Sequence, residues 1–197
     1  MILVVIILFP VLQLPPKAMA QASISKGNTD APSSKTNSID DLIKKGVGLA
    51  KLGKYNDAIS LFDQTLVIEP NNINALIDKG LTLRVIGKNN EAMTSYDKAL
   101  SINPNDIQAL KGKALVLVDL QKYNEAMVLF DKVLSMNPND TEALSRRASV
   151  LGGLNRYDEA INTLDKALSI NPTLQEAAHL NADGIQALKN NSSAKNG

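Results

Sequence analysis

The stretch LSINPND, residues 100–106, occurs four times along this 197-residue chain in closely related forms. The other copies read LVIEPNN at 66–72, LSMNPND at 134–140 and LSINPTL at 168–174. Each copy contains one proline, and successive prolines are 34 residues apart. A fixed period with the same residue types in the same slots indicates a stack of similar supersecondary units.

The repeated stretch has the features of a joint between two helices. Pro104 has no amide hydrogen with which to continue the preceding helix, and it disfavours helical backbone at Asn103. Asn105 and Asp106 then offer side-chain oxygens to the first amides of the next helix. We therefore expect one helix to end and another to begin within each copy.

Two helices are expected within each unit. Leu76, Gly80 and Leu83 recur at helical spacing on one face, and a second helix is expected from about Asn90. The first helices are expected to end on a left-handed residue, at Gly53, Gly87, Gln121 and Asn155. The second helices are expected to be capped by Asn56, Asn90, Asn124 and Asp158. Capping-box spacing also occurs in the pairs Ser38 with Asp41 and Asn139 with Glu142.

Several slots hold the same kind of residue in all four units. A small residue in the first helix recurs at Gly46, Gly80, Ala114 and Ala148. Alanine in the second helix recurs at Ala58, Ala92, Ala126 and Ala160. A large residue follows at Phe62, Tyr96, Phe130 and Leu164. These slots, with the prolines, resemble the tetratricopeptide repeat (TPR) family. The resemblance implies an all-α fold, a right-handed superhelical solenoid of four TPR helix pairs plus a C-terminal capping helix.

The resemblance also divides the chain. Four TPR units are expected at 39–72, 73–106, 107–140 and 141–174. Residues 175–189 are expected to form the capping helix, whose polar side chains solvate the end of the stack. Residues 190–197 are expected to form a disordered tail.

The N-terminal residues 1–20 have the layout of a secretory signal peptide, an apolar run followed by the cleavage-site sequence Ala18-Met19-Ala20. No basic residue precedes the apolar run, so an uncleaved membrane anchor and a mis-assigned start are the alternatives. The polar stretch 21–38 is expected to be a flexible linker. We therefore expect an exported, extracytoplasmic protein, either secreted or envelope-associated, with a membrane tether if residues 1–20 stay in place.

Composition and motifs argue against several classes of function. The chain has no cysteine, which excludes disulfides, thiolate metal sites and a cysteine nucleophile. A net charge of +1 gives no strong field for nucleic acid. The single histidine, His179, has no second histidine or cysteine with which to bind a metal. We expect no enzymatic activity, no catalytic residue, no cofactor, no metal site and no nucleic-acid partner.

The resemblance implies a concave wall lined by the first helices, and that wall commonly binds peptides. Its candidate groove residues are Ile43, Val47, Ala50, Ile77, Leu81, Arg84, Lys111, Leu115, Val118, Ser145, Arg146 and Ser149. The set is apolar over three units and includes three cations, so we expect a segment with apolar anchors and some acidic character. The alternative is that these residues pack against adjacent helices and form no specific site.

Co-chaperone members of the family clamp a terminal carboxylate through Lys, Asn and Arg side chains. The corresponding slots here hold Ile43, Val47, Asp78, Gln108 and Gly112, so that ligand is disfavoured. Gly152 and Gly153, near the end of a groove-lining helix, favour early fraying over a hinge or a close-approach site.

Two functions follow from these expectations. The first is a non-catalytic scaffold that binds a protein or peptide partner in the concave TPR groove. The alternative is a structural or assembly protein that self-associates through its repeat array.

Overall fold

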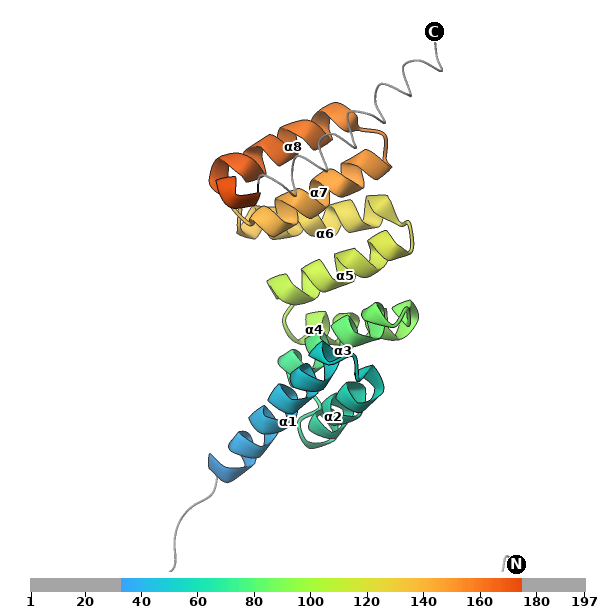
Figure 1. Ribbon diagram of the computed structural model, residues 1–197, viewed down its shortest axis with the longest axis vertical. Coiled ribbons are helices and arrows are strands. Elements are labelled where there is room, and N and C mark those ends of the chain that lie inside the picture. Colours follow the sequence, from blue (N-terminus) through green and yellow to red (C-terminus); the bar gives the residue numbers. More distant parts are fainter. Residues whose placement is uncertain (1–32, 175–197) are drawn as a thin grey trace, which may run out of the picture.

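The computed structural model describes residues 33–174, which form four antiparallel helix pairs stacked along one axis (Figure 1). The described part contains no β-strand. Its elements are α1 (Ser33–Lys51), α2 (Tyr55–Ile68), α3 (Ile73–Val85), α4 (Asn89–Ile102), α5 (Ile107–Asp119), α6 (Tyr123–Met136), α7 (Thr141–Gly153), α8 (Tyr157–Ile170) and the short 3₁₀ turn η1 (Pro172–Leu174). Within these residues no helix is both long and apolar enough to cross a membrane.

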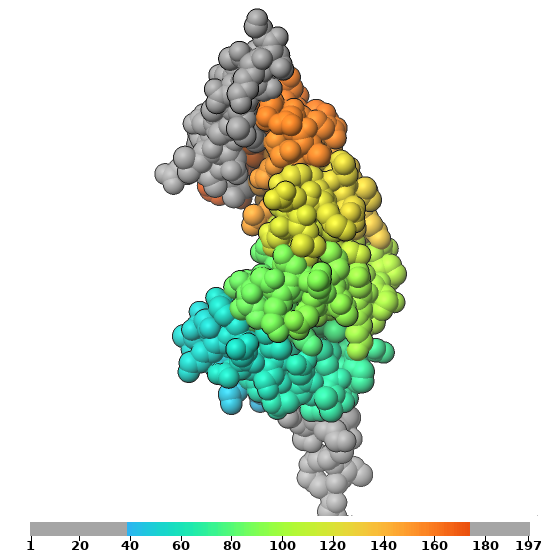
Figure 2. Space-filling model, turned by 90° about the vertical axis from the view of Figure 1, so that its right-hand side faces the viewer, coloured from blue at the N-terminus to red at the C-terminus, as the bar shows by residue number. Residues whose placement is uncertain are grey.

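Each helix packs mainly on its neighbours in the sequence, and the first helix α3 also contacts the first helices α1 and α5. The space-filling view shows the pairs as successive layers from the blue N-terminal end to the orange C-terminal end (Figure 2). The described part is therefore an all-α solenoid, as expected. In such an array each unit is stabilised by its neighbours, because one short helix pair buries too little apolar surface to be stable alone.

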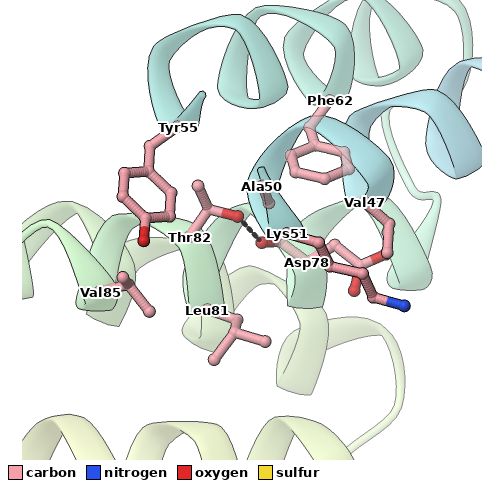
Figure 3. A pocket seen from close by; sticks show the side chains of 9 residues that line it. All are labelled: Val47, Ala50, Lys51, Tyr55, Phe62, Asp78, Leu81, Thr82 and Val85. Atoms are coloured by element: carbon pink, nitrogen blue, oxygen red, sulfur yellow. Dashed lines mark hydrogen bonds between the residues drawn. The ribbon is translucent and has the colours of Figure 1, made fainter. Parts of the chain in front are cut away.

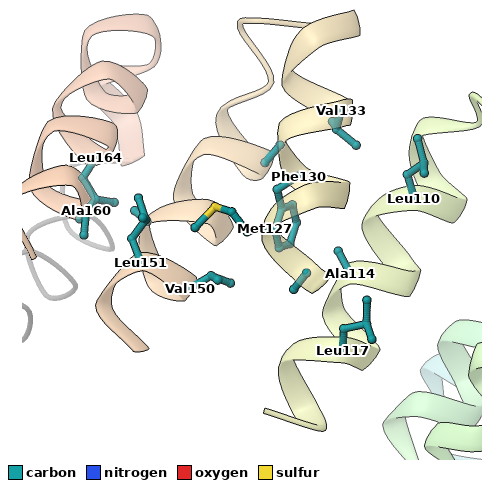
Figure 4. Close-up of a cluster of buried hydrophobic side chains, with 13 residues drawn as sticks. Leu110, Ala114, Leu117, Met127, Phe130, Val133, Val150, Leu151, Ala160 and Leu164 are labelled. Carbon is teal, nitrogen blue, oxygen red and sulfur yellow. The ribbon is translucent and has the colours of Figure 1, made fainter. Parts of the chain in front are cut away.

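Large rings inserted between small residues hold the layers together. Tyr96 is buried, and a Cβ atom added to Gly80 or Gly112 would lie 2.9 or 2.3 Å from its ring. Phe62 approaches Gly46 in the same way, at 2.6 Å. The larger core cluster, drawn in Figure 4, continues this packing through α5 to α8 around Phe130. The small-residue slots thus set how closely the helices approach, as the sequence predicts.

The last residue of each of the first three joints caps the next helix, as Asn72, Asp106 and Asp140. The carboxylate of Asp106 accepts a hydrogen bond from the amide of Ala109 at 2.9 Å, and Asp140 does the same for Ala143. Of the two residues predicted to offer oxygens, Asp106 is the cap and Asn105 is not, and the capping box predicted at Asn139 is wrong because the N-cap is Asp140. The amide of Asn105 instead donates to the side chain of Asn103 at 3.2 Å, which tightens the turn at the proline.

The second helices begin without a side-chain cap. Their N-cap residues are Lys54, Lys88, Lys122 and Arg156, and none of these makes a capping hydrogen bond. The expectation of caps at Asn56, Asn90, Asn124 and Asp158 is therefore wrong. The left-handed residues that end the first helices are confirmed, with φ of 74°, 78°, 59° and 59° at Gly53, Gly87, Gln121 and Asn155. Only the two glycines adopt that conformation without a steric penalty.

Two boundaries differ from the sequence expectation. Helix α1 begins at Ser33, so the last six residues of the predicted linker 21–38 are helical, and Ser38 lies inside the helix instead of capping it. Helix α7 continues through Gly152 and Gly153, so the expected fraying is also wrong. A Cβ atom on Gly153 would lie 3.2 Å from the Tyr123 ring, which makes this glycine a close-approach position.

Several sequence predictions lie outside the described residues. They concern the signal peptide or anchor at 1–20, the linker up to residue 32, the capping helix at 175–189 with His179, and the tail at 190–197. These remain predictions.

A row of ion pairs joins successive units. Each pair joins an aspartate on a second helix to a basic residue on the next first helix, at 2.6 Å in every case. The pairs are Asp63 with Lys79, Asp97 with Lys113, and Asp131 with Arg147. The recurring aspartates, which from sequence alone would be assigned only to helix solvation, therefore mark the interfaces between repeats.

Candidate binding site

A pocket of about 390 Å³ opens between the first and second repeats. It is lined by Val47, Ala50, Lys51, Tyr55, Phe62, Asp78, Leu81, Thr82 and Val85, from α1, α2 and α3. In the close-up, Tyr55 and Val85 stand at one end, and Val47 and Lys51 stand at the other (Figure 3). The volume lies within the range of pockets that enclose a ligand group or an anchoring side chain.

The wall of this pocket is apolar and open to solvent. Leu81 is 46% exposed and Val85 is 51% exposed, although both belong to a helix that packs on both sides. Phe62, by contrast, is fully buried and forms part of the pocket's base. Two large aliphatic side chains exposed side by side over a buried ring form an apolar patch with no cover among the described residues, the kind of surface that marks interaction sites.

One carboxylate lines the pocket. Asp78 is half-buried there, and its side chain has no hydrogen-bond or ion-pair partner among the described residues. Its backbone oxygen accepts from the Thr82 hydroxyl at 2.7 Å, as the dashed line in Figure 3 shows. Burial raises the pKa of the Asp78 carboxyl above its usual value, because burial disfavours the charged form.

A buried hydroxyl lies within electrostatic reach of Asp78. Burial raises the pKa of Tyr96 to about 12, while the charge of Arg84 lowers it and the charge of Asp78 raises it. Both charged residues belong to α3.

The predicted groove residues separate into two sets. Val47, Ala50 and Leu81 come together in the pocket. The other apolar ones on α1 to α5, Ile43, Ile77, Leu115 and Val118, are half-buried and do not line it. Sequence reasoning missed the other six pocket residues, which are Lys51, Tyr55, Phe62, Asp78, Thr82 and Val85. Asp78 carried a signal, because it is an acid in a slot that holds glycine 34 residues later.

Two cations expected to attract an acidic ligand are already paired. Arg84 Nη1 lies 2.9 Å from a carboxylate oxygen of Asp119 on α5. Lys111 is only 8% exposed, and its Nζ lies 2.6 Å from Glu142 and 3.4 Å from Asp140. Burial lowers the pKa of Lys111, but the hydrogen bonds and charges of the two carboxylates raise it further, so the net shift is upward. Neither cation is free to bind an acidic segment.

The fourth repeat presents a different surface. The hydroxyls of Ser145 and Ser149 donate to backbone oxygens one turn earlier in α7, at 2.8 and 3.2 Å. Arg146 is exposed and forms no ion pair with any described residue. None of these three predicted groove residues lines the pocket between the first two repeats.

Comparison with known families and structures agrees with this architecture. A family model described as Tetratricopeptide repeat matches residues 117–184, and one described as Anaphase-promoting complex, cyclosome, subunit 3 matches residues 51–130. A search of curated proteins gave no match.

Solved structures share the fold at low sequence identity. MamA is similar over 81% of this chain and 88% of its own, with a TM-score of 0.65 and 20% identity. PilF of Pseudomonas aeruginosa is similar over 80% of this chain and 72% of its own, with a TM-score of 0.72 and 18% identity. YrrB, described as a TPR protein with an unusual peptide-binding site, is similar over 79% of this chain and 84% of its own, with a TM-score of 0.61 and 23% identity. The fold, the repeated slots and the family models together show that the chain is a tetratricopeptide repeat protein. Proteins of this family are typically non-catalytic scaffolds for protein interaction.

Proposed function

We propose that this protein is a non-catalytic scaffold that binds an extended peptide segment of a partner protein in the pocket between its first two repeats. The observation that carries the proposal is the exposure of Leu81 and Val85 over the buried Phe62 in one pocket. YrrB, whose description names a peptide-binding site, supports the class of ligand. The apolar wall supplies the contact area, and side chains of the peptide are its anchors.

Selection from a displayed library of random peptides on the immobilised full chain tests this proposal. We expect peptides with apolar anchors to be enriched, and Leu81→Asp to abolish their binding, because a charge in the apolar wall would have to be desolvated. Val128→Asp is the matched control, since Val128 is 66% exposed on α6 and lies outside the pocket. Equal binding by the wild type and both variants, with the helical circular dichroism unchanged, would contradict the proposal.

Self-association is the second candidate, and the row of ion pairs favours it. In each ion pair, a basic residue on a first helix contacts an aspartate on the second helix of the preceding repeat. The basic position of the first repeat is Lys45, and the acidic position of the fourth repeat is Asp165. Neither side chain has an ion-pair partner among the described residues. Stacking of one copy on another would bring these two slots together. Light scattering at several concentrations separates the candidates, because a mass that grows with concentration supports self-association and a constant monomer mass argues against it.

Export is a further part of the proposal. The layout of residues 1–20 supports a cleaved signal peptide, with a membrane anchor as the alternative. Mass spectrometry of the protein from cell fractions tests this. A protein that begins at Gln21 in an extracytoplasmic fraction would support export with cleavage of residues 1–20. An intact N-terminus in the cytosol would contradict export.

A further inference from the structure

The pocket between the first two repeats contains an acid, Asp78, whose side chain has no hydrogen-bond or ion-pair partner among residues 33–174. Asp78 is the only carboxylate among the nine lining residues. Its neighbours across the pocket are aliphatic or aromatic apart from Thr82 and the exposed Lys51 at one end. A half-buried carboxylate gains a charge-assisted hydrogen bond when a cationic group is placed beside it.

We call the interface between the first and second repeats the first junction, and the interface between the second and third repeats the second junction. The second junction has an ion pair in the slots that surround the pocket at the first. Arg84 occupies the slot that Ala50 holds one repeat earlier, and Asp119 occupies the slot of Val85. At the second junction these two residues form an ion pair at 2.9 Å between α3 and α5. At the first junction, alanine and valine replace them, so both the arginine and its acid are missing from their slots, and the space is a pocket.

The acid reappears at the first junction in a different slot. Asp78 stands where the next repeat has Gly112. The first junction therefore has an acid in the pocket wall and no basic side chain of its own in the arginine slot.

We propose that this pocket seats a lysine or arginine side chain of the bound peptide, with its aliphatic stem against Ala50, Leu81 and Val85 and its cationic head at Asp78. The inference deepens the proposed function and rests on it. The partner's basic side chain takes the place that Arg84 occupies at the second junction. Long basic side chains suit such a pocket because they bury an apolar stem and keep a charged end at a polar group.

The other charges near the pocket fit this assignment. The guanidinium of Arg84 is already paired with Asp119 and does not neutralise Asp78. The Lys51 side chain is exposed and makes no ion pair with Asp78. An acidic anchor would instead meet the Asp78 carboxylate. Arg84 and Lys111 are engaged elsewhere, and the cation that remains in the lining is the exposed Lys51 at one end of the pocket.

Library selection on matched variants tests the inference. The full-length wild type, Asp78→Asn and the control Asp41→Asn are immobilised and screened against the same random peptide library, with Leu81→Asp as the pocket knockout. Asp41 is an exposed acid on α1 that does not line the pocket. Burial penalises the charged form of Asp78, so Asp78→Asn is expected to fold at least as well as the wild type.

The expected result is a lysine or arginine at one fixed position of the wild-type peptides, next to apolar residues. Asp78→Asn lowers affinity for a synthetic copy of such a peptide about tenfold and removes the basic preference, because a charge-assisted hydrogen bond is lost. Asp41→Asn changes neither.

Two outcomes overturn parts of the account separately. If peptides bind in a Leu81-dependent way but show acidic or no charged preference, or keep a basic preference on Asp78→Asn, the basic-anchor inference is wrong and the proposed function stands. If no peptide binds in a Leu81-dependent way, both are wrong.

Discussion

The first and second junctions of the solenoid use the same slots for opposite purposes. At the second junction, Arg84 and Asp119 form an ion pair that fills the space between first helices. At the first junction, Ala50 and Val85 hold those slots and leave a pocket of about 390 Å³. The backbone architecture is the same in both. A few side chains at fixed positions therefore distinguish a junction that contains an ion pair from one that contains a pocket.

The third junction supports the same conclusion by another means. Gly153 holds the slot of Val85 and Asp119, and the ring of Tyr123 lies against it. Tyr123 shares its slot with Tyr55, whose ring borders the open pocket. The tyrosine ring lies close to a glycine at the third junction, whereas at the first junction it lies beside valine and alanine and borders a pocket.

The largest expected effect on stability is at Gly112, which occupies the same position in the third repeat as Asp78 does in the second. Gly112→Ala places a Cβ atom 2.3 Å from the Tyr96 ring, which has no room to move because it is fully buried. We expect a loss of about 3 kcal/mol in the free energy of unfolding, at the upper end of overpacking costs. Urea denaturation measures it. The matched change Asp78→Ala in the same slot is expected to be tolerated, and an equal loss in both variants would remove the distinction between the junctions.

The second prediction concerns the ion pair that closes the second junction. Asp119→Val leaves Arg84 without a partner, and the Arg84 Nε atom is already buried without a hydrogen bond. We expect a loss of about 1–2 kcal/mol in the free energy of unfolding, since both side chains are partly exposed and their attraction is screened.

The double variant Arg84→Ala with Asp119→Val is the control for that prediction. It removes both charges and copies the first junction, so it is expected to cost less than Asp119→Val alone. A double variant that is less stable than the single variant would contradict the view that the unpaired arginine carries the cost.

The third prediction closes the first junction. Ala50→Arg with Val85→Asp transfers the second junction's ion pair onto the pocket walls. We expect a change in stability below about 1 kcal/mol, because a half-exposed ion pair adds little. Affinity for a library-selected peptide, measured by fluorescence anisotropy, is expected to fall at least tenfold. Unchanged affinity would show that the peptide binds elsewhere.

The smallest effect concerns the acid in the pocket. Burial raises the pKa of Asp78 in the folded protein, so its contribution to stability is fully present below the unfolded pKa and is lost as pH rises through the folded pKa. Asp78→Asn is therefore expected to melt slightly higher than the wild type at neutral pH. The difference in melting temperature should shrink toward acidic pH. A difference that grows on acidification would mean that Asp78 has a favourable partner in the folded state.

The recurring residues predicted the fold, and the varying residues hold the candidate site. Period, small-residue slots and buried rings are short-range or repeated signals, so the sequence predicts helix pairs and their stacking. The cap positions were less certain, because Asn105 and Asp106 both offer side-chain oxygens and only backbone geometry selects Asp106. The N-cap of α4 is Lys88, which makes no side-chain capping hydrogen bond. The preference of asparagine for N-cap positions led to the wrong prediction at Asn90.

The site could be predicted only in part, because it depends on which side chains meet across a junction. The positions of Ala50 and Leu81 in the repeat predict that they line the groove. The pocket itself depends on Val85, which has no carboxylate with which to form the ion pair that Asp119 makes at the second junction. Arg84 and Lys111 were expected to face a ligand, and they instead pair with acids on the next first helix. Such pairing depends on distances between helices that no single unit specifies.

The most direct measurement is a map of peptide-induced changes in backbone amide chemical shifts, using a library-selected peptide and the wild-type protein. The account predicts the largest shifts at Ala50, Asp78, Leu81 and Val85, with little change at Arg84's partner Asp119 or at Gly153. Largest shifts around Ser145, Arg146 and Ser149, with none at the first junction, would contradict the claim that the open junction is the binding site.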